Sequence, residues 1–458
     1  MAKISSLSAM SLIVNKMIGT GIFSTPSIIF QYCGGNISLY LLLWVLGSLV
    51  IGCGMIIYLE YSLNLPIRNG GEKNYLQKVY HPRFIGFVYS FQIVLLGFSS
   101  GNSYAFGKYV LFSIFGDQQF NDSYVKLIGV GCISFCCYLH IVHHKQSNLF
   151  FNILGISKIL ILMLIIFCGA LVWLGIIEVP RSGNFTNMLE SQYETNYYSI
   201  SVALLEIIYS FKGWENANYV LSETSNPYKV LTRSAPLAVV VTTLLYFLVI
   251  LSYLVVIPKT EIMSSGVLIA GIFFNKIFGE TITSKILPLF ISVSNFGNVL
   301  AVSYAHSMVN KELALENLVP FSSYFQHFNW SMFLHWLVTV VVLVAPPSTE
   351  IYEFVVNLYI YPGTWINILL TLGLIYLKLK DDSWNTEELT SLLSPKPRIR
   401  FSTPWVCIIT FLAANLFMAL FPFVKPPIAS VIPYWCFPVI GTGVLVLGGV
   451  YYFIEKLF

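Results

Sequence analysis

The chain has 458 residues, of which 56% are hydrophobic and 10% are charged, and its formal net charge is +4. Soluble domains carry about 25% charged residues, so this composition excludes a soluble globular protein. The thinly spread basic residues also exclude a nucleic-acid-binding groove. Apolar residues recur in runs of about 20, long enough to cross a hydrocarbon core of about 30 Å. We therefore expect an all-α integral membrane protein embedded in the lipid bilayer.

About twelve apolar runs, each bounded by polar residues, proline or glycine, predict membrane-spanning helices. The predicted spans cover residues 5–31, 37–61, 83–115, 124–143, 151–177, 196–222, 234–257, 284–312, 331–346, 352–379, 403–422 and 434–455. Because the connections are mostly short, we expect one membrane domain over 1–458, with 380–401 as a solvated loop. The eight cysteines show no metal or redox spacing, so we expect neither a metal site nor a cofactor.

The distribution of lysine and arginine predicts the orientation of the chain in the membrane. With the N-terminus inside, the cytoplasmic connections collect most of these residues, as the positive-inside rule requires. Both termini are therefore expected in the cytoplasm. Two N-glycosylation patterns, which begin at Asn121 and Asn184, then fall in outer connections, although such patterns are common by chance.

The first span is interrupted near its middle, where Gly19 and Gly21 flank Thr20 and Pro26 follows. Glycine weakens a helix interior and lets a ligand approach the backbone closely. An unwound turn here would expose N–H groups at the positive end of the second half-helix, which suits a carboxylate. The same small residues also fit a packing site for a neighbouring helix. The motif alone leaves both interpretations open.

The sixth span carries ionisable residues where a spanning helix should be apolar. Glu206, Lys212 and Glu215 lie inside it, and Gly213 follows the lysine. Ionisable groups at this depth are energetically expensive and mark an aqueous path or a mutual pair. An ion pair between Lys212 and Glu215 would account for the charges but not for the adjacent glycine.

The two interrupted spans occupy corresponding positions in two halves of the chain. If residues 5–177 and 196–379 are repeats, each interrupted helix is the first of its half, and the helices of 403–455 are additional. Paired glycine-interrupted spans are a sequence signal for a transporter site near the bilayer midplane. Half-helix N-termini suit a carboxylate and unwound carbonyls suit an ammonium group, so the pattern favours a zwitterionic ligand.

At these residues the sequence resembles the amino acid–polyamine–organocation superfamily, and within it the fungal methionine permeases, relatives of the L-type amino acid transporters. The resemblance covers nearly the whole chain. The stretches that carry it lie at 15–26, 66–76, 211–219, 222–227, 294–298 and 316–321. It implies a leucine-transporter-type fold, in which an inverted five-plus-five repeat is followed by two C-terminal helices, and it implies that 266–279 forms an outer lid helix.

The resemblance also implies which residues bind the substrate. The turn of the first span would hold the substrate carboxylate, and carbonyls around both interruptions would hold its amine. The expected binding set is Met17, Ile18, Gly19, Thr20, Gly21, Tyr209, Ser210, Phe211, Lys212 and Gly213. Lys212 is a departure, because relatives often have a small residue there, and a cation in the unwound turn would alter selectivity.

Four residues are candidates for coupling or gating: Lys158, Glu206, Tyr209 and Glu215. Tyr209 stands where relatives place an aromatic gate. Lys158 matches a lysine of sodium-independent relatives whose ammonium replaces a sodium ion beside the interrupted first span. Snorkelling to the membrane surface is the alternative for Lys158. Because a buried lysine shifts its pKa readily, we expect protons to take part in transport.

These observations predict proton-coupled uptake of a neutral amino acid, methionine or another sulfur-containing one. Uptake requires the plasma membrane, which we expect, although the sequence itself does not separate it from an internal membrane. A broader neutral amino acid exchanger and a non-transporting sensor are the alternatives on the same fold, and a sensor would need a soluble tail that this chain hardly has. A membrane enzyme is not expected, since the histidines His140, His143 and His144 have no carboxylate partner or nucleophile motif nearby.

Overall fold

The computed structural model confirms the all-α membrane class. It describes residues 6–66, 68–116, 121–142, 144–180, 182–219, 221, 224–279, 282–345, 351–380, 384, 401–427 and 432–457. Within these ranges, nine helices are long and apolar enough to cross a membrane, or ten if the bent pair Ala9–Phe23 and Thr25–Tyr32 is one span. The shorter apolar helices Tyr197–Phe211 and Phe328–Val344 stand at the expected sixth and ninth spans. Most of the predicted loop 380–401 lies outside the described residues.

The helices follow the predicted order of spans. The first half comprises α1 (Ser6–Met17), α2 (Thr20–Phe23), α3 (Thr25–Tyr32), α4 (Ile37–Asn64), α5 (Glu72–Val79), α6 (Pro82–Leu96), α7 (Ser100–Phe115), α8 (Asp122–Val142) and α9 (His144–Trp173). The second half begins with α10 (Tyr197–Phe211), α11 (Asn216–Tyr219), α12 (Pro227–Lys229), the π-helical turn η2 (Val230–Ser234), α13 (Ala235–Val256), α14 (Lys259–Ser264), the 3-10 turn η3 (Gly266–Leu268) and α15 (Ile269–Phe278). It continues with α16 (Ile282–Leu315), α17 (Ser322–Phe325), α18 (Phe328–Val344) and α19 (Ile351–Lys380), and the terminal part comprises α21 (Trp405–Leu420), η4 (Phe421–Phe423) and α22 (Cys436–Glu455).

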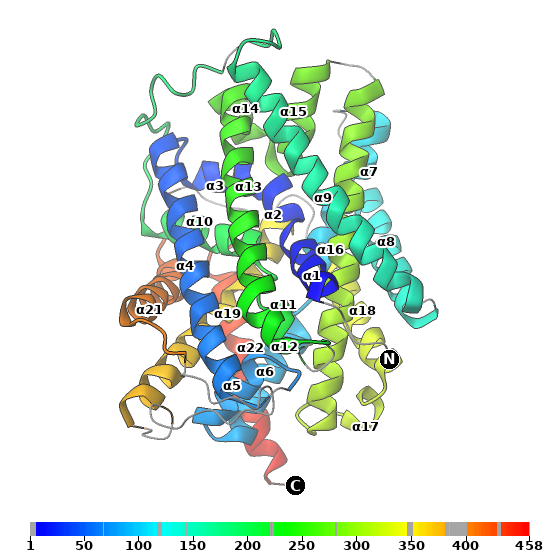
Figure 1. Ribbon diagram of the computed structural model, residues 1–458, viewed down its shortest axis with the longest axis vertical. Coiled ribbons are helices and arrows are strands. Elements are labelled where there is room, and N and C mark those ends of the chain that lie inside the picture. The colour runs from blue at the N-terminus through cyan, green and yellow to red at the C-terminus, as the bar shows by residue number, and fades with distance from the viewer. Residues whose placement is uncertain are drawn as a thin grey trace.

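The connections separate to the two ends of the long axis (Figure 1). The helices α14 and α15 lie at the top of the view, whereas α5 and α17 lie at the bottom and α12 lies in the lower half. This separation is the one expected if the short connections alternate between the two membrane surfaces. The end that carries α5 is the predicted cytoplasmic side, and α15 falls within the predicted outer lid segment.

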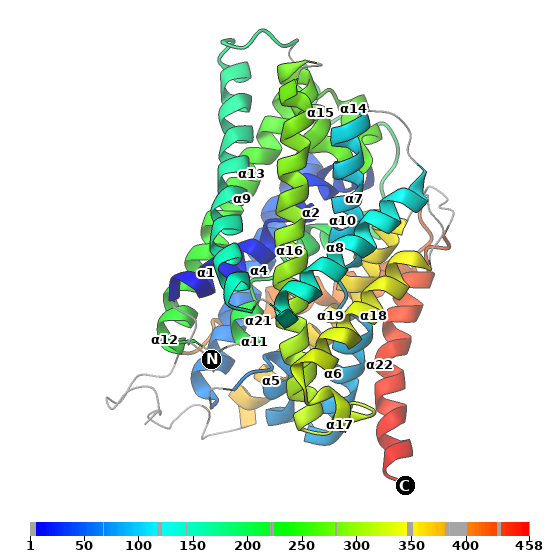
Figure 2. The same ribbon diagram turned by 90° about the vertical axis from the view of Figure 1, so that its right-hand side faces the viewer.

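The two interrupted spans lie at the centre of the bundle. The half-helix α1 packs against α9, α13 and α16, and α10 packs against α3, α4 and α19. The terminal helix α22 packs on α6 and runs along the edge of the molecule in Figure 2. Large apolar side chains such as Leu49, Leu127, Leu160 and Ile409 are exposed on the outer surface. This surface matches a lipid environment, and it leaves the polar residues to line the interior.

The third span, predicted at 83–115, is one candidate membrane span over Pro82–Phe115, but its helix is interrupted. The helix α6 ends at Leu96 and α7 begins at Ser100. A Cβ atom at Gly97 would lie 2.4 Å from Nδ1 of His306, so this position has room only for glycine. The backbone N–H of Ser99 donates to Oγ1 of Thr339, 3.2 Å away. Partners more than 200 residues away in the chain therefore account for the break.

Two polar side chains near helix ends and connections, those of Asn184 and His140, are buried. Asn184, in the second glycosylation pattern, donates from Nδ2 to the carbonyls of Leu254 and Ile257, both at 2.8 Å. Its side chain is bound to the end of α13 and the residue that follows it, and it is not an accessible glycosylation acceptor in this structure. His140 is 1% exposed, and its Nε2 lies 2.8 Å from the carbonyl oxygen of Leu300. It belongs to a helix interface rather than to the membrane surface, and His143 lies outside the described residues.

A buried carboxylate joins the second span to the segments around the terminal helices. Glu60 of α4 accepts hydrogen bonds from Nζ of Lys378 at 3.2 Å, Nε1 of Trp384 at 3.0 Å and the backbone N–H of Thr403 at 2.7 Å. The side chains of Glu60 and Lys378 are only 2% and 6% exposed. Three donors from outside α4 thus meet on one carboxylate.

Replacing Glu60 by alanine should lower the free energy of unfolding by about 3–5 kcal/mol, because it leaves the Lys378 ammonium buried without its carboxylate. Thermal unfolding of the purified protein, followed by circular dichroism, measures the change. The control is Glu455→Ala, which removes the partner of the half-exposed Arg83. That exposed pair should contribute only about 0–1 kcal/mol. Equal losses in the two variants would contradict the assignment.

Candidate functional site

The first span breaks between α1 and α2, at Ile18 and Gly19. Gly19 has an extended backbone, with φ −158° and ψ −142°. The carbonyls released at the break are bound by side chains from distant helices. The hydroxyl of Tyr246 donates to the carbonyl of Met17 at 2.6 Å, and Nδ2 of Asn298 donates to the carbonyl of Lys16. The unwound segment is thus held in place by α13 and α16.

The sixth span breaks at a turn over 212–215, between α10 and α11. Gly213 has φ +130°, a conformation that side chains disfavour. A Cβ atom there would also lie 2.1 Å from Cγ of Lys16. The glycine beside Lys212 is therefore explained by the close approach of the two interrupted spans.

Gly21 serves a second close approach between the same spans. A Cβ atom at Gly21 would lie 2.4 Å from the Cα atom of Ser210. The hydroxyl of Ser210 donates to the carbonyl of Gly21 at 2.8 Å. Phe211 packs edge-on against Trp44 and lies close to Tyr246, with ring centroids 6.2 and 5.1 Å apart. The small-residue packing that the sequence left open as an alternative thus applies to Gly21.

A cavity that encloses about 380 Å³ of atom-free space lies between the two breaks. We call it the central cavity. Met17, Thr20, Gly21, Tyr209 and Lys212, all in the expected set, line it. The other lining residues are Lys16, Phe98, Gly101, Asn102, Asn298, Val355, Val356 and Tyr359. The remaining expected residues, Ile18, Gly19, Ser210, Phe211 and Gly213, are not among the lining residues.

One wall of the central cavity carries a neutral polar cluster. Oγ1 of Thr20 lies 2.9 Å from the hydroxyl of Tyr209 and donates to Oδ1 of Asn102 at 3.2 Å. The backbone N–H of Thr20, at the start of α2, points to the same Asn102 oxygen at 3.4 Å. An acceptor oxygen from α7 therefore stands where the sequence places a substrate carboxylate.

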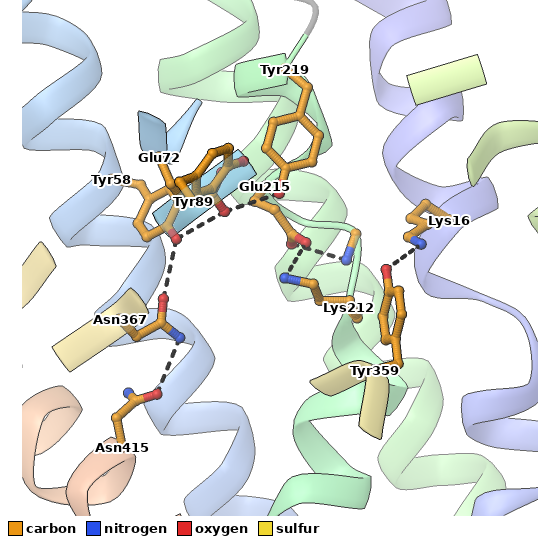
Figure 3. Close-up of polar contacts among 11 residues, drawn as sticks. Lys16, Tyr58, Glu72, Tyr89, Lys212, Glu215, Tyr219, Tyr359, Asn367 and Asn415 are labelled. Atoms are coloured by element: carbon orange, nitrogen blue, oxygen red, sulfur yellow. Dashed lines mark hydrogen bonds and ion pairs between the residues drawn. The ribbon is translucent and has the colours of Figure 1, made fainter. Parts of the chain in front are cut away.

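Charged residues also line or adjoin the central cavity (Figure 3). Nζ of Lys212 lies 2.7 Å from Oε1 of Glu215, and Oε2 of Glu215 accepts from the N–H of Gly213 at 3.0 Å. Nζ of Lys16 donates to the hydroxyl of Tyr359 at 3.0 Å. Two lysines and one carboxylate thus meet beside the cavity, and the ion-pair interpretation of Lys212 and Glu215 agrees with the geometry.

The two remaining coupling candidates lie behind the cavity. Lys158 of α9 is fully buried, and its Nζ donates to the carbonyl of Asn15 in α1. It therefore approaches the interrupted first span rather than the membrane surface. Glu206 of α10 is also fully buried, and neither of its carboxylate oxygens has a hydrogen-bond partner among the described residues.

Sequence reasoning missed Lys16, Asn102 and Tyr359 as cavity residues. Asn102 lies in the run of small and polar residues 99–103 in an otherwise apolar span, which is a signal that could have been read. Lys16 was visible as a charge one turn before the glycines of the first span. Tyr359 had no comparable signal, because aromatic residues are frequent throughout the chain.

The match to a protein-family model decides the family. The model described as amino acid permease matches residues 4–445. This chain belongs to the amino acid permease family. The resemblance to the amino acid–polyamine–organocation superfamily is thereby confirmed, and the permease transports amino acids across the membrane in which its apolar helices are embedded.

Two fungal relatives cover most of the permease. The high-affinity methionine permease of Saccharomyces cerevisiae is 32% identical over 97% of this chain and 78% of its own length. The low-affinity methionine permease of the same yeast is 29% identical over 92% of this chain and 76% of its own length. The human large neutral amino acids transporter small subunit 2 is 25% identical over 69% of this chain and 58% of its own length. The names of these relatives denote transporters rather than enzymes.

Proposed function

We propose that this permease takes up a neutral amino acid, methionine or another sulfur-containing one, across the plasma membrane. The observation that carries the proposal is the central cavity, which joins a polar wall at a half-helix N-terminus to an apolar wall. Phe98, Val355 and Val356 supply the apolar surface. A thioether side chain fits such a surface, since sulfur makes favourable contacts with aromatic rings. The two methionine permeases among the relatives support the same substrate class.

In the proposed binding mode, the substrate carboxylate replaces Oδ1 of Asn102 at the N–H and hydroxyl of Thr20. The positive end of α2 and the backbone N–H of Thr20 favour an anion at this point. The substrate amine faces the carbonyls around Met17 and Tyr209, and Tyr209 covers the bound substrate as a gate. The substrate side chain then extends toward α19 and Phe98.

Transport proceeds by alternating access of the central cavity to the two membrane surfaces. We propose that the halves 5–177 and 196–379 are the inverted repeats that move relative to each other, with both termini in the cytoplasm. Proton coupling is the proposed energy source, because Lys158, Glu206 and Glu215 are ionisable and adjoin the interrupted spans. Buried ionisable residues in transporters mark proton pathways.

A broader neutral amino acid exchanger is the second candidate. It is favoured by the similarity to the large neutral amino acids transporter small subunit 2. The two candidates differ in substrate range and in the need for a counter-substrate.

Uptake by the purified protein in liposomes tests the proposal. Labelled methionine should accumulate in liposomes without an internal amino acid, and unlabelled sulfur-containing amino acids should compete best. Uptake that occurs only with internal amino acid, and that leucine or phenylalanine inhibits equally well, would favour the exchanger. Absence of uptake for every amino acid, in either gradient direction, would refute the proposed transport.

Replacing Thr20 by alanine should weaken methionine binding roughly 10- to 150-fold. The physical reason is the loss of one charge-assisted hydrogen bond to the carboxylate, worth about 1.5–3 kcal/mol. Equilibrium binding of labelled methionine to the purified protein measures the change. Thr20→Ser retains the hydroxyl and should bind as the unaltered protein does. Thr232→Ala is the matched control, because Oγ1 of Thr232 donates to the carbonyl of Tyr228 one turn earlier and Thr232 does not line the central cavity. An unchanged affinity in Thr20→Ala would place the carboxylate elsewhere.

A further inference from the structure

A second cavity lies next to the central cavity and shares Lys212 and Tyr359 with it. It encloses about 440 Å³ of atom-free space. At its far end it reaches Glu72, the first residue of α5, and α5 lies at the end of the molecule that is the predicted cytoplasmic side (Figure 1). A substrate that leaves the central cavity past Lys212 would therefore enter the second cavity before it reaches the cytoplasm.

Glu72 presents a buried carboxylate to the second cavity. It is 4% exposed, and three tyrosine hydroxyls from three elements donate to it (Figure 3). Tyr58 and Tyr219 donate to Oε1 at 3.1 and 3.0 Å, and Tyr89 donates to Oε2 at 3.1 Å. A carboxylate offers about four acceptor positions, so three hydroxyls do not saturate it. The carboxylate is thus oriented by neutral donors and keeps acceptor capacity toward the cavity.

No lysine or arginine among the described residues forms an ion pair with Glu72; Lys212, which lines the same cavity, is paired with Glu215 at 2.7 Å. Burial raises the pKa of the Glu72 carboxyl, and the positive charge of Lys212 acts in the opposite direction. An added ammonium group at Glu72 would likewise favour its ionised form. The second cavity therefore presents a carboxyl group at Glu72 and an ammonium group at Lys212.

His306 of α16 adds a polar side chain to the wall of the second cavity. It is 2% exposed, and its Nδ1 lies toward Gly97, another lining residue, where an added Cβ atom would be 2.4 Å away.

We infer that the second cavity is a further binding station for the zwitterionic substrate, where Glu72 binds its ammonium group and Lys212 its carboxylate. The inference rests on the proposed function, since it assumes that an amino acid passes through the central cavity. Because Lys212 lines both cavities, its ammonium can take over the carboxylate from Thr20 as the substrate moves from the central to the second cavity. This gives a role to a lysine at a position where the resemblance suggests a small residue.

Binding to the purified full-length protein tests this station with two probes, methionine and 3-(methylsulfanyl)propylamine. The amine lacks the carboxylate that the Thr20 wall recognises, so it reports on Glu72. It should bind the unaltered protein, and Glu72→Gln should weaken its binding roughly tenfold or more, as expected for a lost charge-assisted contact. Methionine binding at the central cavity should change less than about twofold, within the scatter expected for distant, independent sites.

The glutamine variant should fold, because its amide oxygen can accept from Tyr58 and Tyr219 while its amide nitrogen donates to the Tyr89 oxygen. Retained methionine binding verifies the fold. Glu316→Gln is the matched control: Glu316 also contacts α5, through Lys73, but does not line the second cavity.

A steric variant tests the same station with Glu72 intact. Gly363 of α19 lines the second cavity, and a Cβ atom there would meet nothing within 4 Å. Gly363→Leu should fill the cavity and abolish amine binding while methionine still binds. Gly443→Leu, where the added Cβ is equally free but lies outside the second cavity, should leave both probes unaffected.

The outcomes separate this inference from the proposed function. No amine binding to the unaltered protein, or amine binding that survives either Glu72→Gln or Gly363→Leu, overturns the second station while methionine binding still supports the proposed function. If Glu72→Gln fails to fold, Gly363→Leu alone decides. If methionine does not bind the unaltered protein, the proposed substrate fails, and the amine result still reports on Glu72.

Discussion

Replacing Gly21 by alanine is expected to reduce methionine uptake roughly tenfold or more. The added methyl group would meet the backbone of Ser210 at 2.4 Å, and a backbone atom cannot swing aside as the end of a side chain can. The first and sixth spans would have to move apart, and overpacking of this kind costs about 1–3 kcal/mol, where 1.4 kcal/mol is a factor of ten. Initial uptake rates in liposomes, with thermal unfolding in parallel, measure both effects.

Gly52→Ala is the matched control for Gly21→Ala. Gly52 lies inside α4, and a Cβ atom there would meet nothing within 4 Å. Because alanine favours a helix by about 1 kcal/mol over glycine, this variant should be as stable as the unaltered protein or slightly more so. If both variants transport normally, the close contact between Gly21 and Ser210 is not required for transport.

Replacing Glu206 by glutamine should abolish the effect of a pH gradient on methionine accumulation while leaving methionine exchange intact. A charged carboxylate without hydrogen-bond partners is costly in this buried position, so Glu206 should bind a proton when the permease adopts this state. Glutamine mimics that protonated form at every pH. One turn along α10, Tyr209 contacts Thr20 in the central cavity, which links the proton to the substrate site. Uptake with and without an inward pH gradient measures the coupling.

The charged group that faces Glu206 from another helix is Glu353 of α19, which accepts a hydrogen bond from Tyr32 of α3. Its negative charge further favours a proton on Glu206. Glu190→Gln, at an exposed outer position, is the control and should keep the full response to the pH gradient. An unchanged response in Glu206→Gln would move the coupling to Lys158 or Glu215.

The sequence predicted the membrane class, the order of spans and the two central interruptions, because each depends on local composition. Glycines beside Thr20 and charges around Lys212 are incompatible with a continuous apolar helix, whatever the arrangement of the other helices. The length of each apolar run in the sequence likewise predicts the length of the membrane-spanning helix. These features need no knowledge of which helices are neighbours.

The features that the sequence did not predict depend on tertiary contacts. The break at Gly97 arises where His306 packs against the third span, and no local pattern announces that neighbour. Gly21 lines the central cavity, but it also permits the close contact with Ser210. The sequence does not predict that contact, because Ser210 lies 189 residues later in the chain. The carboxylate of Glu72 stands in a predicted loop, and only the assembled helices bring three tyrosines to it.

The contact of Gly213 with Lys16 constrains how this protein can diverge. The stem of Lys16 fills the space where a side chain at position 213 would stand, so the two positions cannot both enlarge. A larger residue at 213 would require a smaller residue at position 16 as well as a different backbone conformation at 213, where φ is +130°. The change at position 16 would remove one of the ammonium groups beside the central cavity. Replacement of Gly213 is therefore expected to be accompanied by loss of the positive charge at position 16.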